Sequence, residues 1–269
     1  MNRLSVITAV ALAVLTLSAC GHRSARNTDS EDSLRAFDQE QLEASIKMEV
    51  DSLASEMSRL ELLLFLQDDG NGGLKLTEEE LKIKPDYLLN PVSADSTTTL
   101  AEKYRMLGAL DVDRKLASLY EMPTEEYDKA IVRLTAEISD PSLVVIQQGG
   151  SIAETSRALY DAMEANGRMN CFWQLAASVI IEQFYITARN SEKLSGSISD
   201  EAAASVTYRL SLIIDALKRL SAYDRDIKPV VLAMVSLSGI NATTAIELKH
   251  QVDASRDKIE SVRKLLLNP

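Results

Sequence analysis

The sequence predicts an all-α fold, an irregular bundle of about eight to ten helices. Apolar residues recur at intervals of three and four along most of the chain, which is the period of an amphipathic helix. Residues 143–146 (LVVI) are the best candidate for a strand, yet the signals on either side favour a helix. An array of helical hairpins is the alternative, because residues 152–190 and 200–240 each resemble a hairpin, although no repeat period is evident.

The first expected helix covers residues 42–64 and is followed by a glycine-rich segment at residues 67–73. Thr77 and Glu80 then form a capping box that starts a short helix, and Pro85 ends it. The apolar stripe of the first helix contains Leu42, Ile46, Val50, Leu53, Met57, Leu60 and Leu64.

A second capping box, Thr99 with Glu102, opens the next helix. Its apolar pattern continues to Leu119, and we expect a break near residues 111–113, where two aspartates interrupt the pattern. Thr124 precedes a further amphipathic helix of about four turns.

Asp140 followed by proline predicts an N-cap with proline at the first helical position. Ser151 and Glu154 form a third capping box, which opens a helix that ends at Gly167. Residues 170–189 are apolar on almost every face, so this helix is expected to be central and buried.

Three more helices are expected in the last third of the chain. Ser199 or Asp200 caps the first, and Pro229 starts a short apolar one. The final helix runs from about Thr243 to Leu267. Its inner face carries Leu248, Val252, Ile259, Val262 and Leu266.

Composition restricts the function classes. The formal net charge of −11 argues against nucleic-acid binding and against a basic surface that docks on anionic lipid. Hydrophobic residues make up 46% of the chain, which is enough for a folded core. The 269 residues fit one large helical domain or two smaller ones.

The N-terminus has the three parts of a signal peptide. Arg3 gives a short basic start, residues 4–17 are apolar and uncharged, and small residues precede Cys20. The apolar run is shorter than the roughly twenty residues that a membrane-spanning helix needs. An uncleaved anchor and an ordinary secretory signal are the alternatives.

This segment resembles the signal peptide of bacterial lipoproteins, because residues 17–20 (LSAC) match the lipobox of that class. The resemblance implies cleavage before Cys20 and a covalent lipid on its sulfur. Gly21 stands where an Asp would retain many such proteins at the inner membrane, so the outer membrane is favoured, on its periplasmic or its surface side.

Three regions follow from this resemblance and from the helical pattern. Residues 1–19 are the expected signal peptide, and residues 20–32 contain the lipidated Cys20 and a polar tether. Residues 33–269 form the helical domain, with a subdivision near residues 140–150 left open. Once Cys20 carries lipid, Cys171 has no cysteine left for an intramolecular disulfide.

A degenerate EF-hand pattern gives a weak candidate for a calcium loop at Asp69, Asn71, Thr77 and Glu80. In this register Gly73 and Leu74 stand where a ligand and the required glycine belong. Starting at residue 68 restores the glycine, but two ligand positions are then glycines. The alternative is a glycine-rich turn between two helices.

Other metal chemistry has little support. Glu247 and His250 share one helical face, but the chain has two histidines in all, so a carboxylate-bridged di-iron site is excluded. We expect no metal site there and a surface histidine instead.

Glu182 is the one candidate for general acid–base chemistry, because it lies inside the most apolar helix. A structural ion pair is the favoured interpretation, and Arg209, on a following helix, is a candidate partner. Phe172, Trp173, Glu182 and Tyr185 are a candidate ligand pocket, and core packing is the alternative. Cys171 has no nearby histidine and is expected to be a core residue.

From these patterns we expect a lipid-anchored protein of the cell envelope that has no catalytic activity and no cofactor besides the lipid. It would contact the membrane through the lipid and bind another envelope protein as a scaffold or accessory. The alternative is an envelope lipoprotein that binds calcium or a small ligand, and an enzyme that uses Glu182 is a third hypothesis.

Overall fold

The computed structural model describes residues 40–42, 44–45, 48, 78–144, 152–193, 198–222 and 224–267. Residues 1–48 and 49–269 are separate compact units, and the described residues of the first unit are helical. The described part of the second unit contains helices and no strand, which confirms the all-α prediction. Its α-helices are α2 (Glu78–Lys82), α3 (Leu100–Leu119), α4 (Glu125–Ile138), α6 (Ile152–Ala165), α7 (Met169–Arg189), α8 (Asp200–Leu220), α9 (Lys228–Val235), α10 (Ala245–Ala254) and α11 (Arg256–Leu267). Four short 3-10 helices join them: η2 (Pro91–Ser96), η3 (Pro141–Leu143), η4 (Ser191–Lys193) and η5 (Arg225–Ile227).

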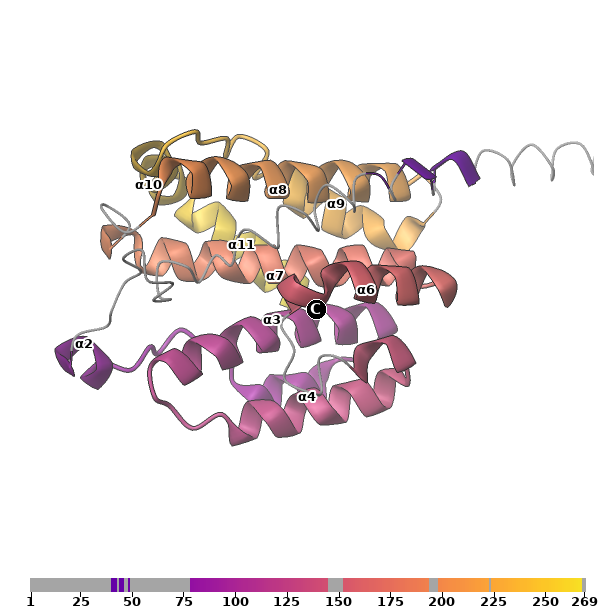
Figure 1. The fold of residues 1–269 in the computed structure, drawn as a ribbon, viewed down its shortest axis with the longest axis horizontal. Coiled ribbons are helices and arrows are strands. Elements are labelled where there is room, and N and C mark those ends of the chain that lie inside the picture. Colours follow the sequence, from indigo (N-terminus) through magenta and orange to yellow (C-terminus); the bar gives the residue numbers. More distant parts are fainter. Residues whose placement is uncertain are drawn as a thin grey trace, which may run out of the picture. The chain divides into compact units, whose positions relative to one another are not determined.

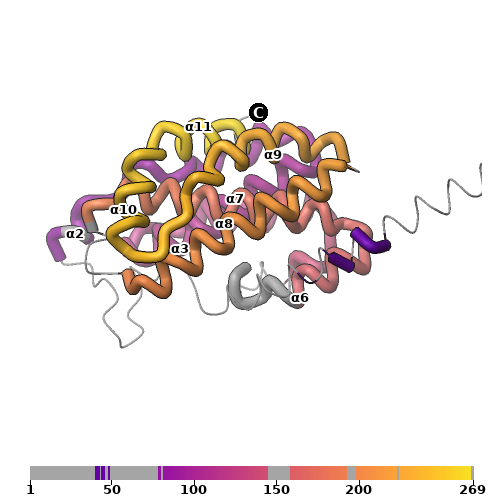
Figure 2. Tube along the Cα trace, turned by 90° about the horizontal axis from the view of Figure 1, so that it is seen from above, coloured from indigo at the N-terminus to yellow at the C-terminus, as the bar shows by residue number. Residues whose placement is uncertain are grey.

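Helix α7 is the centre of the second unit, as its apolar sequence predicts. It contacts α3, α6, α8, α10 and α11, and all but a few of its side chains are buried. In Figure 1, α7 lies between α3 on one side and α8 with α11 on the other. Helix α4 packs on α3, and Figure 2 shows α9 turning back from the end of α8.

The most extensive helix–helix contact joins α3 to α7, and Gly108 makes it close. A Cβ atom added at Gly108 would lie 2.4 Å from Oγ of Ser178 and 2.9 Å from the carbonyl oxygen of Leu175. Both distances are shorter than carbon and oxygen atoms tolerate, so the two helices could not keep this separation with a larger residue.

Several predicted helix starts are confirmed by their hydrogen bonds. The backbone N–H of Glu102 donates to Oγ1 of Thr99, and the Glu102 carboxylate accepts the N–H of Thr99 in return. Asp140 accepts the N–H of Ser142 at the start of η3. Ser199 caps α8 in the same way, whereas Thr124 makes no capping bond to α4.

Two predicted boundaries are wrong. Helix α3 continues through residues 111–113, because the Asp111 carboxylate is neutralised by Arg114 and Lys115 one turn further along the same helix. The final helix is two helices, α10 and α11, which meet at Ser255. The N–H of Ser255 bonds to carbonyl groups of α10 and ends that helix.

Several other predictions fall wholly or largely outside the described residues. They are the signal peptide and tether (residues 1–32), most of the helix at residues 42–64, and the end of the strand candidate at residues 145–146. Leu143 and Val144, which are described, lie in helical turns. No helix in the described part of the chain combines the length and apolarity that crossing a membrane requires.

The Gly108→Ala variant should test the close contact between α3 and α7. We expect the clash with Ser178 and Leu175 to lower the free energy of unfolding by about 1–2 kcal/mol, after the higher helix propensity of alanine offsets part of the strain. Urea denaturation followed by circular dichroism measures this change.

Gly239→Ala is the matched control, because a Cβ atom at Gly239 meets no atom within 4 Å. It should change the free energy of unfolding by less than about 0.5 kcal/mol. Equal effects of the two substitutions would contradict the close packing at Gly108.

Candidate functional site

Two buried acids and one arginine form a cluster where α3, α7 and α11 meet; we call Asp113, Glu182 and Arg263 the acid–arginine cluster. Nε of Arg263 donates to Oε2 of Glu182 and Nη2 donates to Oε1, both at 2.7 Å. Both carboxyl side chains are fully buried, and the Arg263 side chain is 14% exposed. The guanidinium therefore engages both oxygens of Glu182, which is the strongest geometry for such a pair.

Asp113 joins this cluster to the chain segment before η2. Its Oδ2 accepts the backbone N–H of Leu89 at 2.7 Å, and its carboxyl group lies close enough to Glu182 for the two groups to influence each other's pKa. The hydroxyl of Tyr127 on α4 donates to the carbonyl oxygen of Leu89 at 2.9 Å. Residues from α3, α4, α7, α11 and the segment around Leu89 are thus held together around two carboxyl groups.

Two tyrosine rings lie beside the cluster. The Arg263 guanidinium lies 4.1 Å from the ring centroid of Tyr185, and Tyr87 meets Tyr185 edge-on with centroids 6.2 Å apart. Nδ2 of Asn190 donates to the Tyr87 hydroxyl at 2.7 Å. The two segments KPDYLLNP (residues 84–91) and CFWQLAASVIIEQFY (residues 171–185) therefore meet at this cluster.

Burial dominates the electrostatics of the cluster. Loss of solvation, followed by the nearby charge of Glu182, raises the pKa of Asp113 well above its ordinary value. Burial also raises the pKa of Glu182, although the hydrogen bonds from Arg263 oppose that shift. Burial alone would lower the pKa of Arg263, but its bonds to Glu182 raise it overall, so the guanidinium stays charged.

The predicted burial and ion pairing of Glu182 are confirmed, but the predicted partner is wrong. Glu182 pairs with Arg263 of α11 rather than with Arg209 of α8, which is itself buried. The sequence does hold a signal for Arg263: it lies four residues after Ile259 and three before Leu266, on the buried face of its helix.

The aromatic residues proposed as a ligand pocket are mostly core. Phe172 and Trp173 are almost fully buried and pack edge to face with centroids 5.5 Å apart, and Tyr160 packs on Phe172 in the same way. The structure separates the four proposed residues into two groups: the packed pair Phe172 and Trp173, and Glu182 with Tyr185 beside Arg263.

Cys171 is a buried free thiol at the start of α7. Burial raises the pKa of this thiol to about 11, so it is protonated at neutral pH and is a poor nucleophile. This agrees with its predicted place in the core.

The candidate calcium ligands Asp69, Asn71 and Thr77 lie outside the described residues, and of Glu80 only the backbone is described, within α2. Glu247 caps α10 by accepting the N–H and hydroxyl of Thr243, and His250 is exposed. In the described ranges no group of three or more His, Cys, Asp or Glu side chains is placed to hold a metal ion.

A second polar cluster, which the sequence did not reveal, joins α3 to the segment before η3. The Tyr104 hydroxyl donates to Oδ2 of Asp140 at 2.5 Å and accepts from Nη1 of Arg168 at 3.1 Å. Oδ1 of Asp140 also accepts the Ser142 hydroxyl at 2.6 Å. Burial and the bond to Asp140 raise the pKa of Tyr104, so its hydroxyl remains a donor.

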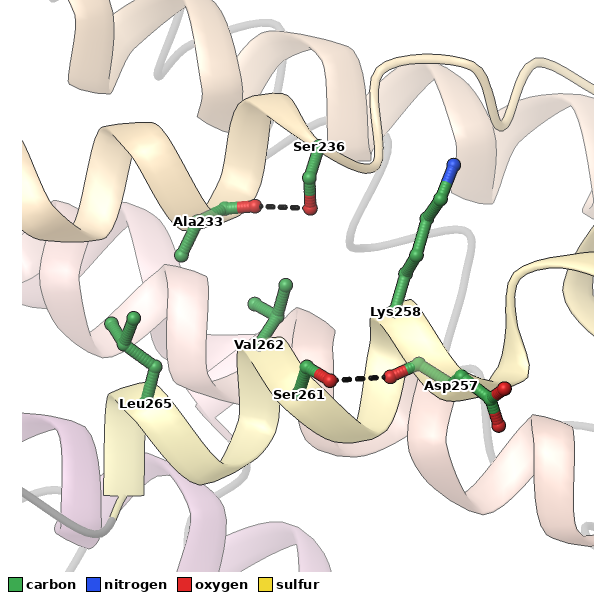
Figure 3. Close-up of a pocket in the computed structure, with 7 residues that line it drawn as sticks. All are labelled: Ala233, Ser236, Asp257, Lys258, Ser261, Val262 and Leu265. Atoms are coloured by element: carbon green, nitrogen blue, oxygen red, sulfur yellow. Dashed lines mark hydrogen bonds between the residues drawn. The ribbon is translucent and has the colours of Figure 1, made fainter.

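A shallow apolar groove lies between α9 and α11; we call it the α9–α11 groove (Figure 3). It has a volume of about 370 Å³, and Val262 and Leu265 of α11 face Ala233 of α9 across it. Leu265 is 48% exposed, and Leu232 of α9 is 76% exposed. The helical pattern gave no signal for this groove, because it depends on how α9 and α11 pack. Its full lining is Ala233, Ser236, Asp257, Lys258, Ser261, Val262 and Leu265.

The Arg263→Met variant should test the ion pair of the acid–arginine cluster. It leaves the Glu182 carboxylate buried without its cation, so we expect the free energy of unfolding to fall by about 3–5 kcal/mol. The double variant Glu182→Met/Arg263→Met replaces both charges by apolar groups and should recover a large part of this loss. Urea denaturation of the three proteins gives the coupling energy, and purely additive losses would refute the pairing.

Arg189→Met is the matched control for these variants. The Arg189 guanidinium also lies over a tyrosine ring, that of Tyr87 at 5.5 Å, but its side chain is 41% exposed. Its loss should change the free energy of unfolding by less than about 1 kcal/mol.

The acid–arginine cluster joins helices, the cluster around Tyr104 joins α3 to the segment before η3, and the α9–α11 groove is open to solvent. The chain was compared with protein-family models, with curated proteins and with solved structures, and none of them matches it.

Proposed function

We propose that this chain is a lipid-anchored protein of the cell envelope that acts through contacts with another protein, without catalysing a reaction. The lipobox ending in Cys20 supports the anchor, and the α9–α11 groove supplies a surface for the partner. The outer membrane is the favoured location, because Gly21 follows the lipidated cysteine.

The observation that carries the non-catalytic part of this proposal is the engagement of Glu182. Both of its oxygens accept hydrogen bonds from Arg263, and the side chain has no exposed surface. A general acid or base must reach a proton on its substrate, within hydrogen-bonding distance. Glu182, the best candidate for such chemistry, instead joins α7 to α11.

Other buried charged groups also join elements of the fold. Arg105 of α3 donates from Nε to the carbonyl oxygen of Leu266 at 2.8 Å and also bonds to the side chain of Gln174 on α7. Asp140 joins the start of η3 to α3 through Tyr104. These ionisable groups connect elements of the fold, which supports a structural role for them rather than a chemical one.

The α9–α11 groove supports binding by protein contact. Exposed apolar side chains that gather in a groove mark interaction sites more often than isolated ones do. The space between two helices suits the apolar face of an amphipathic helix. Leu265 in the groove and Leu232 on the same pair of helices are the apolar anchors that such a partner would cover.

The Cys20→Ser variant tests the anchor. Without a sulfur to carry the lipid, the protein should move from the membrane fraction to the soluble fraction of the cell, because the acidic chain has little attraction for anionic lipid. Fractionation and detergent-phase partitioning measure the change. A Cys20→Ser protein that stays in the membrane fraction would contradict the lipid as the sole anchor.

Photo-crosslinking in living cells tests the partner surface. A photoreactive residue at Leu265, which lines the groove, or at Leu232, which precedes the groove residue Ala233, should give a discrete crosslinked product, since both side chains are exposed. The matched control is Val132 on α4, which is 52% exposed. The same products from Val132 as from Leu265, or none from any of the three positions, would count against the groove.

A further inference from the structure

We propose that Asp113 and Glu182 share one proton in the folded protein, and that this proton makes the fold more stable as the pH falls from neutral to mildly acidic. The proposal rests on the geometry of the acid–arginine cluster and is independent of the lipid anchor and of the α9–α11 groove.

The acid–arginine cluster contains two acids and only one base. The Arg263 guanidinium bonds to Glu182, and Asp113, which also has no exposed surface, interacts with both, so the cluster is neutral only if one carboxyl group is protonated. An uncompensated charge in a dry interior is far more costly than a protonated acid. The two carboxyl groups also lie close to each other, and a proton on one of them would replace their mutual repulsion by a hydrogen bond.

The hydrogen bonds identify the atom that carries the proton. Both oxygens of Glu182 accept from Arg263, and Oδ2 of Asp113 accepts from Leu89. Within the described residues no donor reaches Oδ1 of Asp113. A buried carboxylate oxygen that accepts no hydrogen bond is energetically costly. If Oδ1 is protonated, it becomes a donor instead and can donate to Glu182.

The other titratable groups around Asp113 do not change the assignment of the proton to its Oδ1. Arg263 of α11 is the cation, and Glu182 of α7 is the second acid. Tyr127 of α4 and Tyr87 also feel the Asp113 charge, and burial raises the pKa of each phenol to about 12. Both phenols are therefore neutral from acid to mildly alkaline pH, and they neither add nor remove charge.

The sign of the pH effect follows from the raised pKa of Asp113. In the unfolded chain this group titrates near its ordinary pKa of about 4, whereas in the folded protein burial and Glu182 raise its pKa well above that value. Between the two values the folded state holds a proton that the unfolded state has lost. The resulting stabilisation is fully present below about pH 4 and is lost as the pH rises through the folded pKa.

The test compares unfolding of the full-length chain with that of Asp113→Asn between about pH 5 and pH 9. Asparagine mimics the protonated acid, since its amide donates to Glu182 and its oxygen accepts from Leu89. As the pH rises from the unfolded pKa of Asp113 toward its folded pKa, the wild type should lose stability relative to the variant. The ratio of their unfolding equilibrium constants, wild type over variant, should rise about tenfold per pH unit in that range. Parallel curves for the two proteins would overturn the proposal.

Asp111→Asn is the matched control, because it removes the same charge from the same helix. Asp111 is also buried, but Arg114 and Lys115 at 2.7 and 3.0 Å compensate its carboxylate. Its replacement should lower stability and leave the extra pH slope of the wild type in place. An Asp111→Asn protein that lost the slope would contradict the assignment to Asp113.

Carboxyl-carbon NMR of the wild-type chain tests the proton even if Asp113→Asn does not fold. With aspartate labelled at its carboxyl carbon, one signal should keep the chemical shift of a protonated acid above about pH 6, where ordinary aspartates are fully ionised. If every aspartate titrates below about pH 5, Asp113 does not carry the proton and the proposal is overturned.

Discussion

The two hydrogen bonds from Arg263 to Glu182 compensate a carboxyl group that the helical core encloses completely. In so dry a setting an unpaired charge would cost several kcal/mol, so the position of α11 against α7 is set by the need to keep this pair together. Asp113 extends the same requirement to α3 and, through Leu89 and Tyr127, to α4. Apolar packing around α7 provides the bulk of the core, and the acid–arginine cluster adds polar contacts where its helices meet.

Local patterns predict the helices well and their partners poorly. Thr99 with Glu102 is a signal within one turn of chain, and the structure has this capping box as predicted. The break expected at residues 111–113 is absent, because the pattern shows two charges in an apolar stretch and does not show that Arg114, Lys115 and the core compensate them. Arg263 was missed for a similar reason: an arginine on an apolar face is easily taken for a boundary residue.

The candidate sites also differ in how far the sequence predicts them. The burial of Glu182 follows from its own helix, which has no polar face, and the structure agrees. Its pairing with a residue 81 positions away depends on tertiary packing, as does the α9–α11 groove. The otherwise apolar core encloses a few charged side chains where its helices meet, and a few apolar side chains such as Leu232 are exposed.

The bond from Arg105 to the carbonyl oxygen of Leu266 spans 161 positions of sequence. Together with the pair of Glu182 and Arg263, it makes the closure of the core depend on α11, which the ribosome produces long after α3 and α7. Without α11, Glu182 has no cation to pair with and Arg105 has no Leu266 carbonyl to bond. Contacts between such distant residues also slow folding. The same distant contacts that secure the finished bundle therefore delay its completion until α11 has been synthesised.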